Sequence, residues 1–95
     1  MKQFSRRPGV ELLEISGEYL LVATKDARES CPYVTQINEA AAEYWRMLDQ
    51  PCSIEELTLH AIQDKGKEKK DVFPAVLAFI GKLSKNGYLV EEEAG

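Results

Sequence analysis

Ninety-five residues, of which 44% are hydrophobic and 29% charged, are typical of a soluble globular protein with room for one core. The net charge of −4 argues against a general binder of nucleic acids, because such proteins carry a positive surface. No apolar run approaches the roughly 20 residues of a membrane-spanning helix, and residues 1–9 lack the apolar stretch of a signal peptide. The two cysteines are too few for a disulfide framework. We therefore expect one domain, residues 1–95, in the cytoplasm and with reduced thiols.

The first half of the chain indicates a small antiparallel sheet. Residues 1–9 are polar and basic and end in Pro-Gly, so we expect a loose N-terminal arm. Residues 10–15 and 19–24 are rich in β-forming side chains, and the Gly-containing connection between them indicates a hairpin. After a charged loop, residues 33–37 alternate as a third strand would. A sheet of three such strands has open edges, and an open edge can pair with another strand.

Capping residues predict where the first two helices begin. Asn38 can accept hydrogen bonds from the free N–H groups of the turn after it, so we expect a helix over residues 38–48. Ser53 followed by Glu56 has the spacing of a capping box, which predicts a second helix over residues 54–64. Trp45 lies at core spacing in the first of these helices, so we expect it to be buried.

The end of the chain completes the predicted fold. A third helix is predicted over residues 71–86, with Pro74 in its first turn and Gly87 just past its end. A short extended segment, residues 88–90, and an acidic tail, residues 91–95, follow. Strands that precede helices in this way are typical of an α+β domain. We expect a small three-stranded antiparallel sheet followed by a winged-helix-like unit of three helices.

The predicted third helix carries more apolar surface than a small core needs. Its apolar side chains spread over roughly 160° of the circumference, at about 100° per residue. A surface helix needs a stripe of only roughly 100°. The apolar residues are Val72, Phe73, Val76, Leu77, Phe79, Ile80 and Leu83. The surplus indicates a groove that receives a partner, and the alternative is a tight core that fills the whole arc.

Nothing in the sequence indicates catalysis or metal binding. His60 is the only histidine, and its position away from the core face of its helix leaves it without a partner for acid–base work. Cys31 and Cys52 lie far apart, so with one histidine they do not supply the closely spaced ligands of a metal site. The basic loop over residues 65–70 could meet phosphates or an acidic peptide, although a solvated loop is the favoured interpretation. We expect no enzyme activity, no cofactor and no metal.

Three motifs, in this order along the chain, resemble the PqqD family. They are Ile37-Asn38-Glu39-Ala40-Ala41 with Trp45 and Leu48-Asp49, then Ser53-Ile54-Glu55-Glu56-Leu57, then Leu83-Ser84-Lys85-Asn86-Gly87-Tyr88-Leu89. The similarity spans residues 7–90. The chain departs from the family's pattern at Gln50, where the family usually has Gly, and over residues 25–32.

The resemblance implies a peptide-recognition element for ribosomally made, post-translationally modified peptides. In the PqqD family, the leader of a precursor peptide adds as a strand to the edge of the third strand and packs against the third helix. The leader is delivered to a modifying enzyme, which is a radical-SAM enzyme in the pyrroloquinoline quinone pathway. Carried over to this chain, the peptide-binding residues would be Tyr33, Val34, Thr35, Gln36, Ile37, Phe73, Val76, Leu77 and Ile80. Replacing Leu77 with Asp would then abolish peptide binding.

Two other functions stay open on the sequence. A winged-helix DNA-binding protein would read bases with its third helix, but the residues expected to point outward are small and only mildly basic. They are Ala75, Ala78, Gly81, Lys82 and Lys85. A small structural subunit of a larger enzyme would use the same groove for a fixed protein segment. An unfilled strand edge can also pair with itself, which would make a homodimer, and we expect neither nucleic acid nor membrane as a partner.

Overall fold

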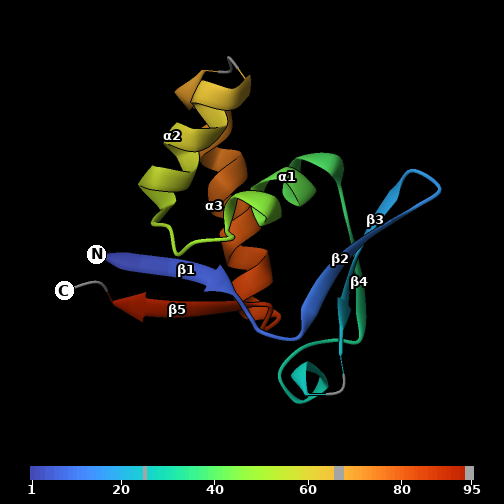
Figure 1. Cartoon of the computed structure of the whole chain (residues 1–95). Coiled ribbons are helices and arrows are strands. Elements are labelled where there is room, and N and C mark those ends of the chain that lie inside the picture. The colour runs from blue at the N-terminus through green and yellow to red at the C-terminus, as the bar shows by residue number, and fades with distance from the viewer. Residues whose placement is uncertain (25, 66–67, 94–95) are drawn as a thin grey trace.

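The computed structural model describes residues 1–24, 26–65 and 68–93. These residues form an α+β fold, as predicted, with a three-stranded antiparallel sheet, a two-stranded sheet and three α-helices (Figure 1). The strands are β1 (Lys2–Arg6), β2 (Val10–Ile15), β3 (Glu18–Ala23), β4 (Val34–Ile37) and β5 (Leu89–Glu93). The helices are α1 (Glu39–Met47), α2 (Ile54–Lys65) and α3 (Lys69–Lys85), and a short 3-10 helix, η1 (Ala27–Glu29), precedes β4.

The predicted hairpin is confirmed, with a tighter turn than expected. β2 and β3 pair antiparallel with Ile15 opposite Glu18, so only Ser16 and Gly17 form the connection. Both have positive φ, 52° at Ser16 and 80° at Gly17, as a two-residue type I′ turn requires. The backbone twist of this turn matches the right-handed twist of the paired strands, and it sets their register.

β4 lies at the edge of the three-stranded sheet, whose strand order is β2-β3-β4. It pairs antiparallel with β3, with Leu21 opposite Thr35 and Tyr19 opposite Ile37. Ile37 is buried and Val34 is exposed, which is the alternation that the sequence predicts. No strand in the described part of the chain pairs with the other edge of β4.

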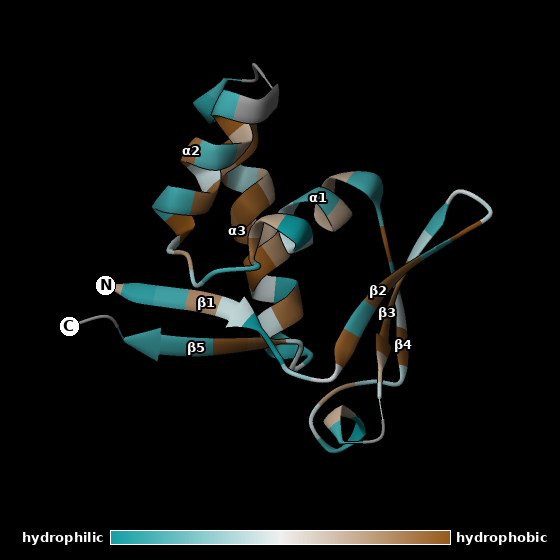
Figure 2. Ribbon diagram, in the orientation of Figure 1, coloured by the Kyte–Doolittle hydropathy of each residue, from teal (hydrophilic) through white to brown (hydrophobic). Residues whose placement is uncertain are grey.

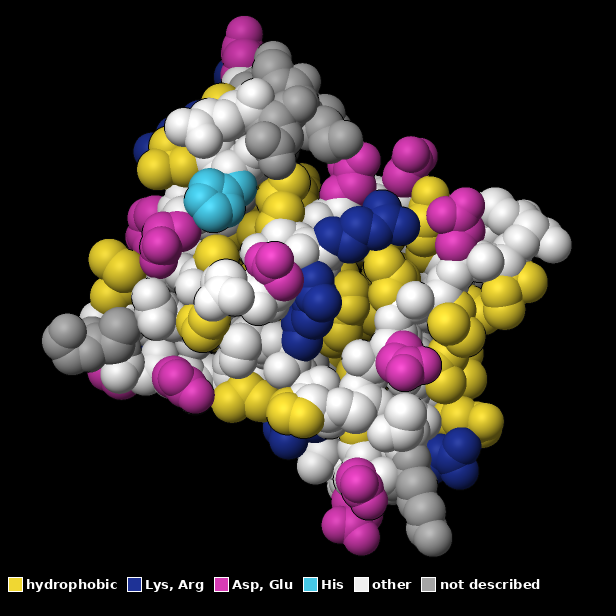
Figure 3. Space-filling view, in the orientation of Figure 1, with side chains coloured by type: hydrophobic (Ala, Val, Ile, Leu, Met, Phe, Trp, Pro, Cys, Tyr) yellow, Lys and Arg dark blue, Asp and Glu magenta, His cyan; other side chains and the backbone are white. Residues whose placement is uncertain are grey.

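The outer face of this sheet also carries apolar side chains. Leu13 and Ile15 on β2 are 38% and 53% exposed, and Val34 on β4 is 48% exposed. Figure 3 shows hydrophobic side chains at the surface over the three-stranded sheet. Both faces of the hairpin are therefore apolar, and only the inner face packs against the helices.

The N-terminal segment is an ordered strand, so the prediction of a loose arm is wrong. β1 pairs antiparallel with β5 along its whole length, and the two strands lie side by side in Figure 1. Phe4 is buried and exchanges backbone hydrogen bonds of 2.7 and 3.0 Å with Cys52. The Arg6 guanidinium donates to the carbonyl oxygens of Trp45 and Arg46 at 2.8 and 2.7 Å, at the C-terminal end of α1. β1 therefore lies between β5 and the C-terminal end of α1 and makes hydrogen bonds to both.

The acidic C-terminal segment is also part of a sheet rather than a free tail. Glu91 to Glu93 belong to β5, with their side chains exposed. The Lys2 ammonium lies 3.2 Å from the Glu91 carboxylate, between two exposed side chains. Residues 94–95 of the predicted tail and residues 66–67 of the predicted basic loop lie outside the described residues.

Both predicted helix caps are confirmed. Asn38 Oδ1 accepts from the backbone N–H of Ala41 at 2.7 Å, at the start of α1. In the capping box before α2, the Glu56 N–H donates to Ser53 Oγ and the Ser53 N–H donates to Glu56 Oε1, both at 3.1 Å. These bonds satisfy backbone donors that the first turn of a helix leaves without partners.

The capping box makes the stability of the protein depend on pH. Hydrogen bonds from the backbone N–H of Ser53, and then from its side chain, hold the pKa of Glu56 below its ordinary value of 4.5. The ionised carboxylate therefore stabilises the folded state above the unfolded-state pKa, and this contribution is lost as the pH falls through the lowered pKa. We expect urea denaturation to show a loss of stability from neutral pH to about pH 3 that is smaller in Glu56→Gln. Equal losses in the variant and the wild type would contradict this assignment.

α3 begins at Lys69, earlier than predicted, so Pro74 lies in its second turn rather than its first. Its C-terminal end is formed as Gly87 predicts. Gly87 has a φ of 83°, and the Tyr88 N–H donates to the Leu83 carbonyl at 2.9 Å, which is the long bond of a Schellman motif.

The core lies between the helices and the inner face of the three-stranded sheet. Figure 2 shows hydrophobic residues along α3 and along these strands. Leu21 of β3, Leu57 of α2 and Leu83 of α3 are at most 1% exposed. Trp45, expected in the core, is 2% exposed, and the Arg6 guanidinium lies 5.7 Å from its ring centroid. No helix in the described part of the chain has the length and apolar character to span a membrane.

Candidate functional site

The free edge of β4 offers backbone groups for another strand. The Ala23 N–H donates to the Tyr33 carbonyl at 2.8 Å, so Tyr33 directs its backbone toward β3. Antiparallel strands alternate between residues that bond to one neighbour and residues that face the other side. Given this register, Val34 and Gln36 point their N–H and C=O groups away from β3. These groups are the ones that an added strand would bind.

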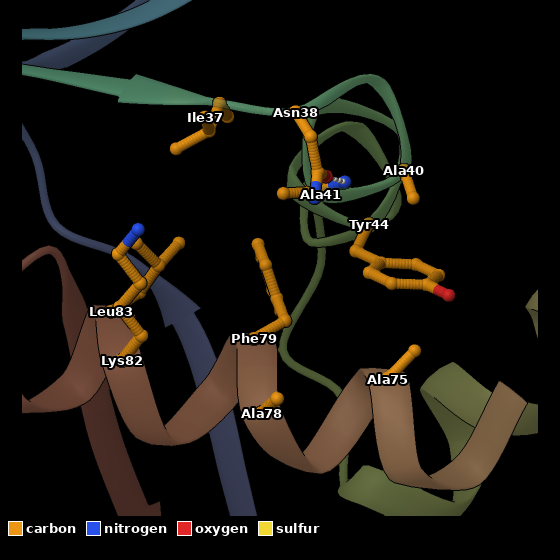
Figure 4. A pocket seen from close by; sticks show the side chains of 10 residues that line it. All are labelled: Ile37, Asn38, Ala40, Ala41, Tyr44, Ala75, Ala78, Phe79, Lys82 and Leu83. Carbon is orange, nitrogen blue, oxygen red and sulfur yellow. Dashed lines mark hydrogen bonds between the residues drawn. The ribbon is translucent and has the colours of Figure 1, made fainter.

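An apolar hollow of about 240 Å³ lies beside the end of β4, between α1 and α3. Its lining residues are Ile37, Asn38, Ala40, Ala41, Tyr44, Ala75, Ala78, Phe79, Lys82 and Leu83. In Figure 4, Phe79 and Leu83 point from α3 toward β4 and α1. The alanines leave the space between the helices open, because their side chains are too short to fill it.

Two aromatic rings give the hollow a firm wall. Tyr44 of α1 and Phe79 of α3 meet edge to face, with centroids 5.4 Å apart and an interplanar angle of 67°. Burial, and then the charge of Glu43, raises the pKa of Tyr44, so its hydroxyl stays neutral at physiological pH. Both rings are less than a tenth exposed. An apolar side chain entering the hollow would therefore pack against rings that are already held in place.

Among the residues that the structure describes, Lys82 is the only charged one that lines the hollow. It makes no ion pair with any described residue. Asn38 also lines the hollow, and its side chain is already engaged as the N-cap of α1. The described lining of the hollow therefore carries one positive charge.

Tyr88 braces the segment that leads into β4. Its side chain is fully buried, and its hydroxyl donates to the Pro32 carbonyl at 2.9 Å and is hydrogen-bonded to Thr35 Oγ1. Burial raises the pKa of Tyr88, so the hydroxyl keeps its proton. Because Thr35 lies in β4, this bond joins the edge strand to the start of β5. Tyr88, just before β5, therefore fixes the position of β4 through hydrogen bonds on the side of the sheet that faces the core.

The predicted strand residues lie together at this edge. Tyr33 is 56% exposed, and the Arg28 guanidinium stacks 3.7 Å from its ring centroid. Val34 is exposed on the outer face of the sheet, while Ile37 is 7% exposed and lines the hollow. Gln36, beside Ile37, is exposed. The structure therefore brings the expected strand to an accessible edge.

The helix residues expected to face β4 lie elsewhere. Val76 and Ile80 are 0% and 5% exposed, within the core. Phe73 and Leu77 line a separate hollow beside β1, which Phe4 also lines. The residues that α3 places at the hollow beside β4 are Ala75, Ala78, Phe79, Lys82 and Leu83. The wide apolar arc of α3 is largely taken up by packing, because α1, α2 and β5 all contact this helix.

The residues that sequence reasoning missed are mostly small. Ala75 and Ala78 on α3 have an alanine-lined counterpart on α1, at Ala40 and Ala41. Small residues at helical spacing on two helices are the signal that could have indicated such a hollow. From the sequence alone, however, the same spacing on α3 is equally typical of a face exposed to solvent. Only the packing of α1 against α3 shows that these residues line a hollow.

The thiols do not contribute to this site. Cys31 and Cys52 are free and buried, and burial is the main cause that raises the pKa of each. Both therefore stay protonated at neutral pH, which makes them poor nucleophiles. Within residues 1–24, 26–65 and 68–93, no three His, Cys, Asp or Glu side chains gather as a metal site would require.

No protein-family model matches the chain, and no curated protein matches it. Two solved structures are similar to it. One is described as lasso peptide synthetase B1 complexed with the leader peptide; it has a TM-score of 0.65 at 20% identity, over 92% of this chain and 96% of that chain. The other is TbiB1 in complex with the TbiA(beta) leader peptide, with a TM-score of 0.67 at 14% identity, over 96% of this chain and 99% of that chain. The chain shares its fold with these two proteins over nearly its whole length.

Proposed function

We propose that this protein is a recognition element that binds the leader segment of a ribosomally made precursor peptide and presents it to a modifying enzyme. The observation that carries the proposal is the open edge of β4 beside an apolar hollow. The two similar structures are each described with a leader peptide bound, which supports the same class of ligand here. The PqqD-like motifs support it as well, and from them comes the further proposal that the modifying enzyme is of the radical-SAM type.

The mechanism follows from the two parts of the site. Main-chain hydrogen bonds to Val34 and Gln36 would hold an extended peptide at the edge of β4, whatever its sequence. A side chain inserted into the hollow against Phe79 would supply specificity and apolar contact. A disordered leader loses conformational entropy when it docks, so its affinity depends on such an anchor. No group of this chain has to act on the peptide chemically, and we propose that the protein itself is not an enzyme.

Strand addition can be tested by a proline at the free edge. In Gln36→Pro the backbone N–H that faces the added strand is removed, while the bonds between β4 and β3 remain. We expect affinity for the leader to fall about tenfold, because one main-chain bond is lost and its partner is left unsatisfied. The measurement is fluorescence anisotropy with a labelled synthetic leader of the precursor peptide encoded beside the gene for this protein.

Gln36→Ala is the matched control, since it removes the same side chain and keeps the N–H. We expect the control to bind as the wild type does. Circular dichroism and urea denaturation of both variants establish that they are folded. If folded Gln36→Pro binds the leader as tightly as Gln36→Ala, the peptide does not add to this edge of β4.

A further inference from the structure

The charge distribution around the hollow indicates what the bound peptide carries. Among the described residues, Lys82 is the single charged side chain of the lining, and it has no ionic partner there. None of the lining residues in the described ranges carries a carboxylate, and the neighbouring exposed positions of α3, Ala78 and Gly81, are uncharged. In Figure 4, Lys82 lies on α3 below Ile37, at the end of the hollow beside the strand.

A strand docked on β4 would cover this end of the hollow and remove water from the Lys82 ammonium. Covering a charge with apolar groups opposes binding, because the lost hydration is not replaced. A carboxylate from the peptide replaces it and forms a charge-assisted hydrogen bond. The simpler interpretation is that Lys82 only offsets the dipole at the C-terminal end of α3. Lys82 and Lys85 both lie in the last turn of α3, so that role does not distinguish them, whereas only Lys82 of the two lines the hollow.

We infer that the leader carries an Asp or Glu two residues from the apolar residue that fills the hollow, and that Lys82 selects this carboxylate. The spacing follows from the geometry of an added strand, in which every second side chain points to the same face. This inference rests on the proposed function, because it specifies the peptide that the same site binds. Lys82 is thus a specificity-determining residue, and the apolar hollow supplies the anchor.

The test uses a display library of random 15-residue peptides selected on the full chain. With the wild type, we expect the enriched peptides to share an apolar residue with Asp or Glu two positions away. With Lys82→Glu, we expect Lys or Arg to replace the acidic residue at that position. Lys85→Glu is the matched control, because it changes the net charge equally on the same helix. It should keep the acidic preference.

Binding of one enriched peptide then measures the size of the effect. Its Glu→Gln analogue should bind the wild type about tenfold more weakly, as expected for a charge-assisted bond. The same analogue should lose less than about twofold against Lys82→Met, which keeps the apolar stem without the charge. Added salt should reduce the preference of the wild type for the acidic peptide.

Two outcomes overturn the inference while the proposed function stands. One is enrichment of peptides that displace the labelled leader from the hollow but share no acidic residue. The other is an equal change of preference in Lys82→Glu and Lys85→Glu, which would reflect net charge alone. If neither the library nor the labelled precursor leader binds the wild type, the proposed function fails and the inference fails with it.

Discussion

Replacing Gly87 with alanine is expected to lower the free energy of unfolding by about 3 kcal/mol or more. Gly87 has a φ of 83°, which L-residues rarely adopt, and it ends α3 through its Schellman motif. A Cβ at this position would overlap the carbonyl of Ser30. Ser30 lies between η1 and β4, so relief of the overlap has to displace the segment that leads into the edge strand. Urea denaturation followed by circular dichroism measures the loss.

Gly17→Ala separates the clash from the backbone strain. Gly17 has nearly the same φ, 80°, but no atom would lie within 4 Å of a Cβ there. We expect this control to lose only about 1 kcal/mol, which is the cost of the left-handed conformation. If both variants lose the same free energy of unfolding, the close approach of Gly87 to Ser30 does not contribute to the effect of Gly87→Ala.

Filling the hollow is expected to have the largest effect on binding. Ala78→Trp places an indole in the space between α1 and α3 that the leader side chain would occupy. We expect affinity for the labelled leader to fall at least about a hundredfold, which is the size of effect seen at the central anchor of an interface. Ala78 is exposed, so the fold should tolerate the larger side chain. Anisotropy titration measures the affinity, and urea denaturation verifies the fold.

Leu77→Trp is the matched control on the neighbouring residue of α3. Leu77 is 46% exposed but faces the separate hollow beside β1. We expect its affinity for the leader to change by less than about twofold, since that hollow lies apart from β4. The same geometry means that Leu77→Asp should leave binding intact, contrary to the prediction from the sequence. A hundredfold loss at Leu77 with none at Ala78 would place the peptide on the other side of α3.

The elements that the sequence predicts correctly depend on local interactions. The Asn38 cap, the Ser53–Glu56 capping box and the glycine end of α3 each involve groups within a few residues of one another. The hairpin between β2 and β3 depends on a two-residue turn. Because these interactions form between neighbours in the chain, residue type and spacing are sufficient to predict them.

The pairing of β1 with β5 is different in kind. It joins the two ends of the chain, and the side chains of Glu91 to Glu93 are those of a solvated tail. Residues 2–6 form a strand only because their backbone pairs with β5 and because Phe4 is buried. Apart from Phe4 these residues are polar or charged, and their pairing with β5 is a contact between distant residues that no local sequence pattern predicts.

The sequence alone determined the fold class, a third strand within residues 33–37 and the wide apolar arc of the third helix. Only the tertiary structure decided the rotation of α3, because an apolar arc wider than one contact allows more than one face to be buried. Packing by α1, α2 and β5 turned Leu77 toward β1 and placed Ala78 and Lys82 at the hollow beside β4. The candidate site is therefore made by the spaces that small side chains leave between packed elements, and such spaces have no signature in a single segment of sequence.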